Sequence, residues 1–186
     1  EKAVKEIHLW VWRNLLPKNM LMIIFFVDQN LKNLPLSEIL DIEKLNNVDK
    51  PIEGANGLPN ECYINKDYLA HEREKVFFNK WTVIGVGSSI PNLGDVKPHN
   101  LLGIPLILLR DKEMKIRVFH NVCSHRGFKL VDKPCTLKNV IRCPYHSWSY
   151  NFNGELVATP HIAGLNNHQS EKFDKIKSNL KEVKTK

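Results

Sequence analysis

The sequence predicts a mainly β fold, built from antiparallel sheets and preceded by one helix. Three observations lead to this prediction: a helical pattern at residues 65–81, short apolar and β-branched runs between residues 82 and 119, and the adjacent pair Asn153 and Gly154. Helices and strands differ in the spacing of their apolar residues, so the change of pattern near residue 81 places the helix before the sheets.

The helical pattern opens at Asn65, a residue type that favours the N-terminal cap of a helix. Asp67 follows in the first turn, where a negative charge is favourable. Apolar residues then recur at positions 69, 76, 77 and 81. These features predict a helix over residues 65–81.

The apolar runs after this helix are typical of antiparallel strands. They cover residues 82–86, 101–109 and 116–119, and Gly103 and Pro105 break the second run. A polar turn at residues 111–113 separates the second run from the third. In the later segment, residues 150–157, the Asn-Gly pair stands between apolar residues, which is the strongest short signal for a β-hairpin.

The two ends of the chain are less regular. Residues 1–57 form a poorly defined extension without a clear period, and they include the apolar run 20–27. This run is interpreted as a buried strand or as translated material before a start at Met20 or Met22, rather than as a membrane anchor, because a spanning helix needs about 20 apolar residues. Residues 166–186 are polar and rich in lysine, and they are interpreted as a solvated tail or a linker.

Length and composition limit the classes of function. A chain of 186 residues, of which 42% are hydrophobic and 25% charged, corresponds to one globular domain with an extension. The 27 basic and 20 acidic residues give a net charge of +7, but no helix-turn-helix, zinc-finger or aromatic RNA-binding pattern accompanies it, so a nucleic-acid partner is disfavoured. A membrane partner is not expected either.

Two short segments combine cysteine with histidine. Cys123 precedes His125 by two positions, and Cys143 precedes His146 by three. Structural zinc sites usually place two cysteines together and two histidines together. One cysteine and one histidine in each segment suit a binuclear centre, in which both thiolates bind one iron and both imidazoles the other. A structural zinc module remains a remote alternative.

At these segments the sequence resembles the Rieske [2Fe–2S] domain of Rieske non-haem iron oxygenases, the family of ring-hydroxylating oxygenase α subunits. The resemblance rests on His-Asn-Val-Cys-Ser-His-Arg-Gly at residues 120–127 and on Arg-Cys-Pro-Tyr-His-Ser-Trp-Ser-Tyr at residues 142–150. Residues 74–81 and 90–95 resemble the stretch that precedes the domain in these subunits. The resemblance implies a Rieske (ISP-like) domain over residues 58–165, lead-in helix included, with two cluster-binding loops.

The resemblance also assigns the ligands of a Rieske [2Fe–2S] cluster. Cys123 and Cys143 would hold one iron, and His125 and His146 the other. Respiratory Rieske proteins carry a disulfide between the cluster loops, but Phe128 and Tyr145 occupy the corresponding positions here, so no loop disulfide is expected. Four further residues are candidates for supporting the ligands: Arg126, Ser147, Trp148 and His120. The other cysteines, Cys62 and Cys135, are expected to be free thiols in a reducing, cytoplasmic compartment.

The resemblance implies the N-terminal, electron-accepting part of an oxygenase. The complete enzyme would use O2 and electrons from NAD(P)H to hydroxylate an aromatic or a quaternary-amine substrate. A ferredoxin or a flavin reductase would donate the electrons, and neighbouring α subunits would form a homo-oligomer. Residues 166–186 would lead toward a catalytic domain with a mononuclear Fe(II), so no catalytic residue is assigned in this chain. The alternative is a stand-alone Rieske ferredoxin.

Basic residues accumulate around the two segments. Five of them outweigh the single acidic residue Asp132, which gives a local charge of +4. These basic residues are Arg126, Lys129, Lys133, Lys138 and Arg142. The surface is interpreted either as a steering surface for an acidic electron donor or as an ordinary solvated face.

Overall fold

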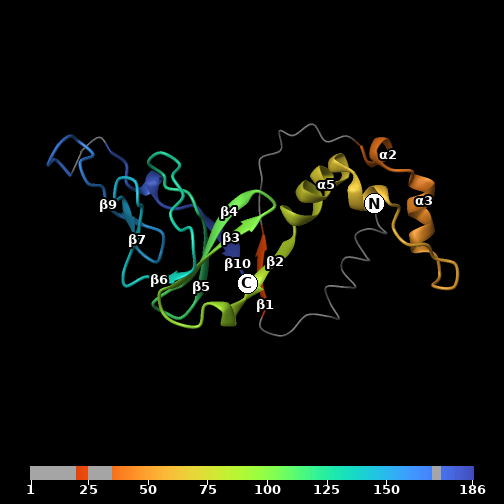
Figure 1. Ribbon diagram of the computed structural model, residues 1–186, viewed down its shortest axis with the longest axis horizontal. Coiled ribbons are helices and arrows are strands. Elements are labelled where there is room, and N and C mark those ends of the chain that lie inside the picture. The colour runs from red at the N-terminus through yellow and green to blue at the C-terminus, as the bar shows by residue number, and fades with distance from the viewer. Residues whose placement is uncertain (1–19, 25–34, 169–172) are drawn as a thin grey trace. The chain divides into compact units, whose positions relative to one another are not determined.

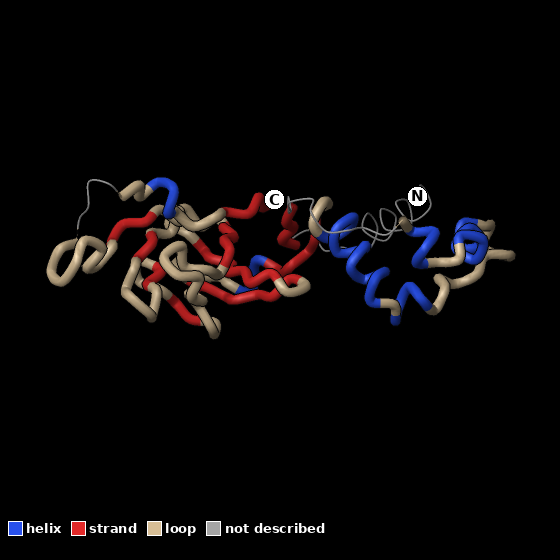
Figure 2. The backbone as a smooth tube through the Cα atoms, turned by 90° about the horizontal axis from the view of Figure 1, so that it is seen from above, coloured by secondary structure: helices blue, strands red, loops and turns tan. Residues whose placement is uncertain are grey.

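The computed structural model describes residues 20–24, 35–168 and 173–186, and it separates them into two compact units (Figure 1). The first unit contains Met20, Ile24 and residues 35–82, and the second contains residues 21–23, 83–168 and 173–186. Helices dominate the first unit and strands the second (Figure 2). Most of the predicted extension, residues 1–19 and 25–34, lies outside the described residues.

The first unit consists of short helices. In the described part of the extension, where the sequence has no clear period, three of them occur. They are α2 (Leu36–Ile39), α3 (Ile42–Asn46) and η1 (Asn47–Asp49). The helices α4 (Glu61–Ile64), α5 (Lys66–Glu72) and η2 (Arg73–Phe77) follow. None of the described helices has the length and apolarity needed to cross a membrane.

The helix predicted over residues 65–81 is confirmed at its start and is too long at its end. The Asn65 side chain accepts hydrogen bonds from the backbone N–H groups of Asp67 and Tyr68, at 2.8 and 3.1 Å, as an N-terminal cap does. The wider π-helical turn η2 ends at Phe77, whose carbonyl accepts a hydrogen bond from the Thr82 hydroxyl at 2.8 Å. Trp81 is therefore the first residue of a strand rather than the last of a helix.

The second unit is built on a seven-stranded sheet with the order β2-β1-β10-β5-β4-β3-β6 (Figure 1). Most of the long strands match the predicted apolar runs, but the strand over residues 95–101 was not predicted, apart from Leu101 at its end. In chain order the strands are β1 (Met20–Ile24), β2 (Trp81–Val86), β3 (Asp95–Leu101), β4 (Ile104–Arg110), β5 (Ile116–His120), β6 (Cys135–Thr136) and β10 (Glu182–Thr185). A short helix, η3 (Gly87–Ser89), follows β2. The register pairs Ile107 with Phe119 and Leu108 with Val118, so the most buried strands lie side by side.

One run that the sequence treats as broken becomes a hairpin. Gly103 lies in the turn between β3 and β4, where Leu102 and Gly103 have φ angles of 49° and 95°, as a tight hairpin turn requires. Pro105, in contrast, does not break the run, because it lies within β4 opposite Asn100. The prediction of a break at Pro105 is therefore wrong.

A second, three-stranded sheet carries the Asn-Gly hairpin. It has the order β7-β8-β9, from β7 (Ile141–Arg142), β8 (Ser149–Tyr150) and β9 (Leu156–Ala158). Gly154 has a φ angle of 82°, and a Cβ atom there would lie 2.5 Å from the Phe119 ring, so only glycine fits the turn. The hairpin predicted from Asn153 and Gly154 is confirmed.

The end of the chain differs from its sequence-based interpretation. The residues that were expected to form a solvated tail contain η4 (Ile176–Ser178) and strand β10, which is hydrogen-bonded between β1 and β5. Leu180 and Val183 are buried. Two apolar side chains among lysines are enough for a short strand whose neighbours supply the rest of the core, and a count of polar residues does not reveal this. Residues 182–185 thus belong to the sheet and not to a solvated tail.

Candidate metal centre

The four predicted ligands lie on two loops with the same backbone geometry. The first loop is residues 123–128, after β5, and the second loop is residues 143–148, between β7 and β8. In each, the cysteine N–H donates to the carbonyl five positions later, at 2.8 Å, and the cysteine carbonyl accepts from the N–H four positions later, at 2.9 or 3.0 Å. Gly127 and Ser147 hold equivalent positions in these turns, and their φ angles are 69° and 58°.

The two thiols form the inner side of the site. Cys123 and Cys143 are 1% and 2% exposed and belong to the main core cluster of the second unit. Burial raises the pKa of the Cys123 thiol, hydrogen bonds from Tyr150 and from the His125 N–H lower it, and the neighbouring Cys143 thiol raises it further, with a net increase. A buried pair of thiols ionises readily only with a cation between them, which is what a metal ion provides.

The two imidazoles form the outer side. His125 and His146 are half-buried, and their ring centroids lie 4.8 Å apart with an angle of 72° between the planes. The Nδ1 atom of His146 is buried and has no hydrogen-bond partner. A buried polar atom without a partner is costly, and coordination to a metal would satisfy it.

Aromatic rings surround the imidazoles. Trp148 is buried and stacks on His125, with 4.6 Å between centroids and 12° between planes. Tyr145 packs on His146 at 3.7 Å, and Phe128 from the first loop contacts Tyr145 at 5.4 Å. Phe128 and Tyr145 are the two residues predicted to replace a loop disulfide, and they join the loops by ring contact instead. They remain 42% and 52% exposed.

Asn121, which is not among the residues predicted from the sequence, fixes the first loop. It is 1% exposed, its Oδ1 accepts hydrogen bonds from the N–H groups of Leu130 and Val131 at 3.1 and 2.9 Å, and its Nδ2 donates to the Val131 carbonyl at 2.7 Å. The amide thereby closes the first loop. Its position directly after a strand and two residues before Cys123 could have indicated this role.

Tyr150 is the second residue that was not identified. It is fully buried in β8, and its hydroxyl lies 3.2 Å from Cys123 Sγ and 2.8 Å from Ser124 Oγ, while it accepts the Ser124 N–H at 3.1 Å. Burial raises the pKa of this hydroxyl well above its ordinary value, so it stays a hydrogen-bond donor at neutral pH. A tyrosine seven residues after Cys143 gives no hint in sequence that it reaches the other loop.

The supporting residues predicted from sequence have different positions. Trp148 lies against His125, as described, and Ser147 shapes the turn of the second loop. Arg126 is exposed, and its positive charge contributes, after burial and His146, to the lowered pKa of His125. His120 is the last residue of β5, and its N–H donates to the Lys181 carbonyl. This bond connects the strand before the first loop to residues 173–186, the C-terminal segment. All five basic residues around the loops are exposed, and Lys129 pairs with Asp132 at 3.0 Å.

The described residues contain no group of three or more His, Cys, Asp or Glu side chains placed to hold a single ion. The four candidate ligands instead form a pair of neighbouring thiols and a pair of neighbouring imidazoles. Two pairs fit a binuclear centre with one pair on each iron. Cys62 and Cys135 are free, as expected, and neither belongs to the two loops.

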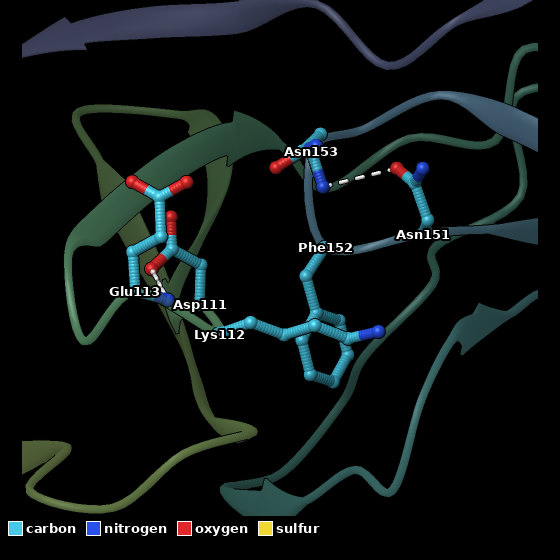
Figure 3. A pocket seen from close by; sticks show the side chains of 6 residues that line it. All are labelled: Asp111, Lys112, Glu113, Asn151, Phe152 and Asn153. Atoms are coloured by element: carbon cyan, nitrogen blue, oxygen red, sulfur yellow. Dashed lines mark hydrogen bonds between the residues drawn. The ribbon is translucent and has the colours of Figure 1, made fainter.

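A pocket elsewhere in the second unit is formed by two turns (Figure 3). Its polar side chains are largely engaged in turn hydrogen bonds: Asp111 accepts from the Glu113 N–H and Asn151 from the Asn153 N–H, at 2.9 and 3.0 Å. Arg117 also donates to Asp111. The pocket is therefore explained by turn formation. Its lining residues are Asp111, Lys112, Glu113, Asn151, Phe152 and Asn153.

Comparison with protein families identifies the domain. The Rieske [2Fe–2S] domain matches residues 80–169. Among curated proteins, the chain is 31% identical over 125 residues to the carnitine monooxygenase oxygenase subunit of Escherichia coli K12, which is 67% of this chain and 33% of that protein. It is 34% identical over 116 residues to the large oxygenase component of salicylate 5-hydroxylase from a Ralstonia species, 62% of this chain and 27% of that protein.

Solved structures give the same result. The quaternary ammonium Rieske monooxygenase CntA, in complex with γ-butyrobetaine, matches 68% of this chain with a TM-score of 0.60 and 31% identity, over 35% of its own length. Naphthalene 1,2-dioxygenase from a Rhodococcus species matches 63% of this chain with a TM-score of 0.55 and 29% identity, over 26% of its length. The chain thus spans about a third of the curated carnitine monooxygenase subunits that it matches.

Proposed function

Residues 80–169 form a Rieske [2Fe–2S] domain whose relatives are oxygenase α subunits, and from this premise we propose that the chain relays single electrons within such an oxygenase. The ligands are Cys123 and Cys143 on one iron and His125 and His146 on the other. When bound, the cluster supplies a site that accepts and releases one electron. The observation that carries the proposal is the unpartnered, buried Nδ1 of His146 beside His125 and the thiol pair.

The burial of the ligands indicates on which side of the cluster electrons are exchanged. The thiols are in the core, whereas both imidazoles are half-buried and lie nearer the surface. Electrons therefore enter and leave on the imidazole side, where Tyr145 and Trp148 limit access of water to the rings. Ring packing also fixes the orientation of both imidazoles before the iron binds, which reduces the cost of forming the site.

The basic residues around the loops support an acidic electron donor. Four of the five have no ion pair with an acidic side chain among the salt bridges of the described residues, which leaves a positive field around the imidazoles. We propose a ferredoxin or a flavin reductase as the donor, because opposite charges accelerate association. If so, the rate of reduction falls as salt is raised from low to physiological concentration; an unchanged rate removes this part of the proposal.

The activity of the whole protein is proposed from its relatives. They include oxygenases named for carnitine, choline, salicylate and 2-aminobenzenesulfonate. We propose that the complete enzyme hydroxylates an aromatic or a quaternary-amine substrate with O2, at a mononuclear Fe(II) in a catalytic domain outside this chain, in the cytoplasm. Inter-subunit electron transfer, described for a quaternary ammonium Rieske monooxygenase, supports a homo-oligomer in which neighbouring α subunits receive the electron.

Metal and sulfide analysis of the 186-residue chain tests the ligand set. After reconstitution we expect about two iron and two acid-labile sulfide ions per chain, and a Rieske-type electron paramagnetic resonance signal after reduction. The chain alone should not turn over substrate. Zinc without sulfide would overturn the proposal in favour of a structural zinc module. His146→Cys is informative, because it should convert the signal toward that of a cluster with more thiolate ligands.

A further inference from the structure

The Tyr150 hydroxyl lies among three groups of the first loop. Its oxygen is 3.2 Å from Cys123 Sγ and 2.8 Å from Ser124 Oγ, and it accepts the Ser124 N–H at 3.1 Å. The Ser124 hydroxyl also donates to the Ser178 carbonyl at 2.5 Å. These contacts form one continuous network from the ligand Cys123 to the C-terminal segment.

Within this network, two acceptors compete for one hydroxyl proton. A carbonyl only accepts, so the Ser124 proton goes to Ser178, and Ser124 Oγ can then only accept from Tyr150. An iron-bound Cys123 thiolate has no proton and also only accepts. Tyr150 has a single hydroxyl proton for these two acceptors. Only one of them can receive a full hydrogen bond at a time.

The C-terminal segment that supplies the Ser178 carbonyl is fixed independently of Ser124. The Leu180 N–H donates to the Gly154 carbonyl at 2.8 Å, and Asn179 Oδ1 accepts the Leu156 N–H at 2.9 Å. Strand β10 then pairs with β5, the strand that leads into the first loop. The segment therefore holds Ser178 in place, and Ser178 in turn holds the Ser124 hydroxyl as an acceptor toward Tyr150.

We propose that the Ser124 hydroxyl, oriented by the C-terminal segment through the Ser178 carbonyl, competes with the Cys123 thiolate for the single proton of Tyr150 and thereby lowers the reduction potential of the cluster. The inference rests on the proposed function, because it takes Cys123 as a cluster ligand. A hydrogen bond to a thiolate stabilises the more negative, reduced state. The residues that continue the chain past the domain would thus influence how readily the cluster accepts an electron. Ser124 acts as a positioning residue and not as a ligand.

Two substitutions with opposite expected signs test the competition. Ser124→Ala leaves the Tyr150 proton with one acceptor, Cys123, so the potential should rise; Tyr150→Phe removes the donor, so the potential should fall. We expect about a threefold change or more in the equilibrium constant for one-electron reduction in each case, where tenfold corresponds to about 59 mV. The double variant should match Tyr150→Phe alone, because Ser124 acts only through Tyr150. Ser124→Thr keeps the hydroxyl and should restore the wild-type potential.

A third substitution tests the role of the C-terminal segment. Asn179→Ala removes the bond to the Leu156 N–H without touching the network. It should loosen Ser178 and raise the potential in the same direction as Ser124→Ala, by a smaller amount. Ser149→Ala is the matched control: it removes a serine hydroxyl beside the second loop that donates to the Ser147 carbonyl at 3.0 Å, and it should not reproduce the rise.

A lower or unchanged potential in Ser124→Ala overturns the competition, and an unchanged potential in Asn179→Ala overturns the role of the C-terminal segment. Iron, sulfide and the resonance signal are measured on every variant. A full cluster with unshifted potentials rejects the inference and leaves the ligand set intact, whereas a wild-type chain without iron and sulfide rejects the proposed function itself.

Discussion

The two loops of the metal centre have the same turn but are closed by different means. In the second loop, the flanking strands β7 and β8 pair directly, with Ile141 opposite Tyr150 and Arg142 opposite Ser149, so the loop is the end of a hairpin. The first loop has a strand on one side only, because no strand occurs between residue 128 and β6. There the amide of Asn121 makes the hydrogen bonds that a neighbouring strand would otherwise make.

This difference shows that a binding loop needs its two ends joined but not by a particular kind of bond. Backbone pairing joins the ends of the second loop, and its formation depends little on which side chains are present. A side chain joins the ends of the first loop, so its stability depends on one residue. We therefore expect the first loop to be the more sensitive of the two to substitution outside the ligands.

The largest effects should come from the ligands, where the two loops are equivalent. Cys123→Ser and Cys143→Ser each remove one of two thiolates from the same iron, and both should abolish the Rieske absorbance and resonance signal after reconstitution. Cys135→Ser, which changes an exposed cysteine of β6, serves as the control and should keep both. Retention of a full cluster in either loop variant would contradict the assignment of that cysteine.

The next largest effect separates the loops. Asn121→Leu removes three hydrogen bonds and leaves buried N–H and C=O groups of Leu130 and Val131 without partners. Because each such group costs about 1–3 kcal/mol, we expect a loss of stability of about 3 kcal/mol or more. The measurement is the urea concentration at which half of the cluster absorbance is lost.

Ser149→Ala provides the corresponding change beside the second loop. It removes one hydrogen bond to the Ser147 carbonyl, and a typical hydrogen bond contributes about 1 kcal/mol. The midpoint should therefore shift much less than in Asn121→Leu. Equal shifts for the two variants would show that both loops depend on side-chain hydrogen bonds to the same degree.

The sequence predicts most of the fold, and its errors have physical causes. The apolar runs predict strands β2, β4 and β5, and the Asn-Gly pair predicts the hairpin of the second sheet, because strand period and turn chemistry are local properties. Strand β10 was missed because its two buried residues, Leu180 and Val183, stand among lysines, and only pairing with distant β5 makes the segment a strand. The helix end was misplaced because Trp81 continues the helical spacing but packs as the first strand residue.

In the candidate site, too, local features were predicted from the sequence and long-range contacts were not. The four ligands were predicted because the type and spacing of metal ligands are set within a few residues. Asn121 and Tyr150 were not, because their partners lie 9 or 10 and 26 or 27 positions away in sequence. The position of Asn121 just before Cys123 is a local signal, but the partners of a side chain that bonds across such a separation do not follow from the sequence. The role of such residues follows only from the folded structure.

The ring contact between the loops offers a smaller and more specific test. Phe128 and Tyr145 join the loops with centroids 5.4 Å apart. In a double-mutant cycle with Phe128→Ala and Tyr145→Ala, we expect a coupling energy of about 0.5–1.5 kcal/mol, the usual range for aromatic pairs. The midpoint of cluster loss in urea measures it for all four proteins. Val122→Ala, another exposed apolar residue next to the first loop, should show no coupling with Tyr145→Ala.

The smallest expected effects have opposite signs in the two loops. Gly127 and Ser147 hold equivalent left-handed positions, and the second loop has there a residue with a Cβ atom. A Cβ at Gly127 would meet no atom within 4 Å, so no clash opposes Gly127→Ala; the left-handed backbone should cost about 1–2 kcal/mol, and the less flexible unfolded chain offsets about 0.4–1 kcal/mol of this cost. Ser147→Gly relieves the same strain but adds freedom to the unfolded chain, which costs about 0.4–1 kcal/mol.

The loss from Gly127→Ala and the gain from Ser147→Gly should therefore be similar in size, about 1 kcal/mol or less each. Cluster loss in urea measures both, and the reduction potential should stay constant, since neither backbone N–H changes its partner. If Ser147→Gly destabilises the protein instead, the serine side chain makes a contribution that outweighs the strain, and the second loop also depends on a side chain. That result would make the two loops more alike than their hydrogen bonds indicate.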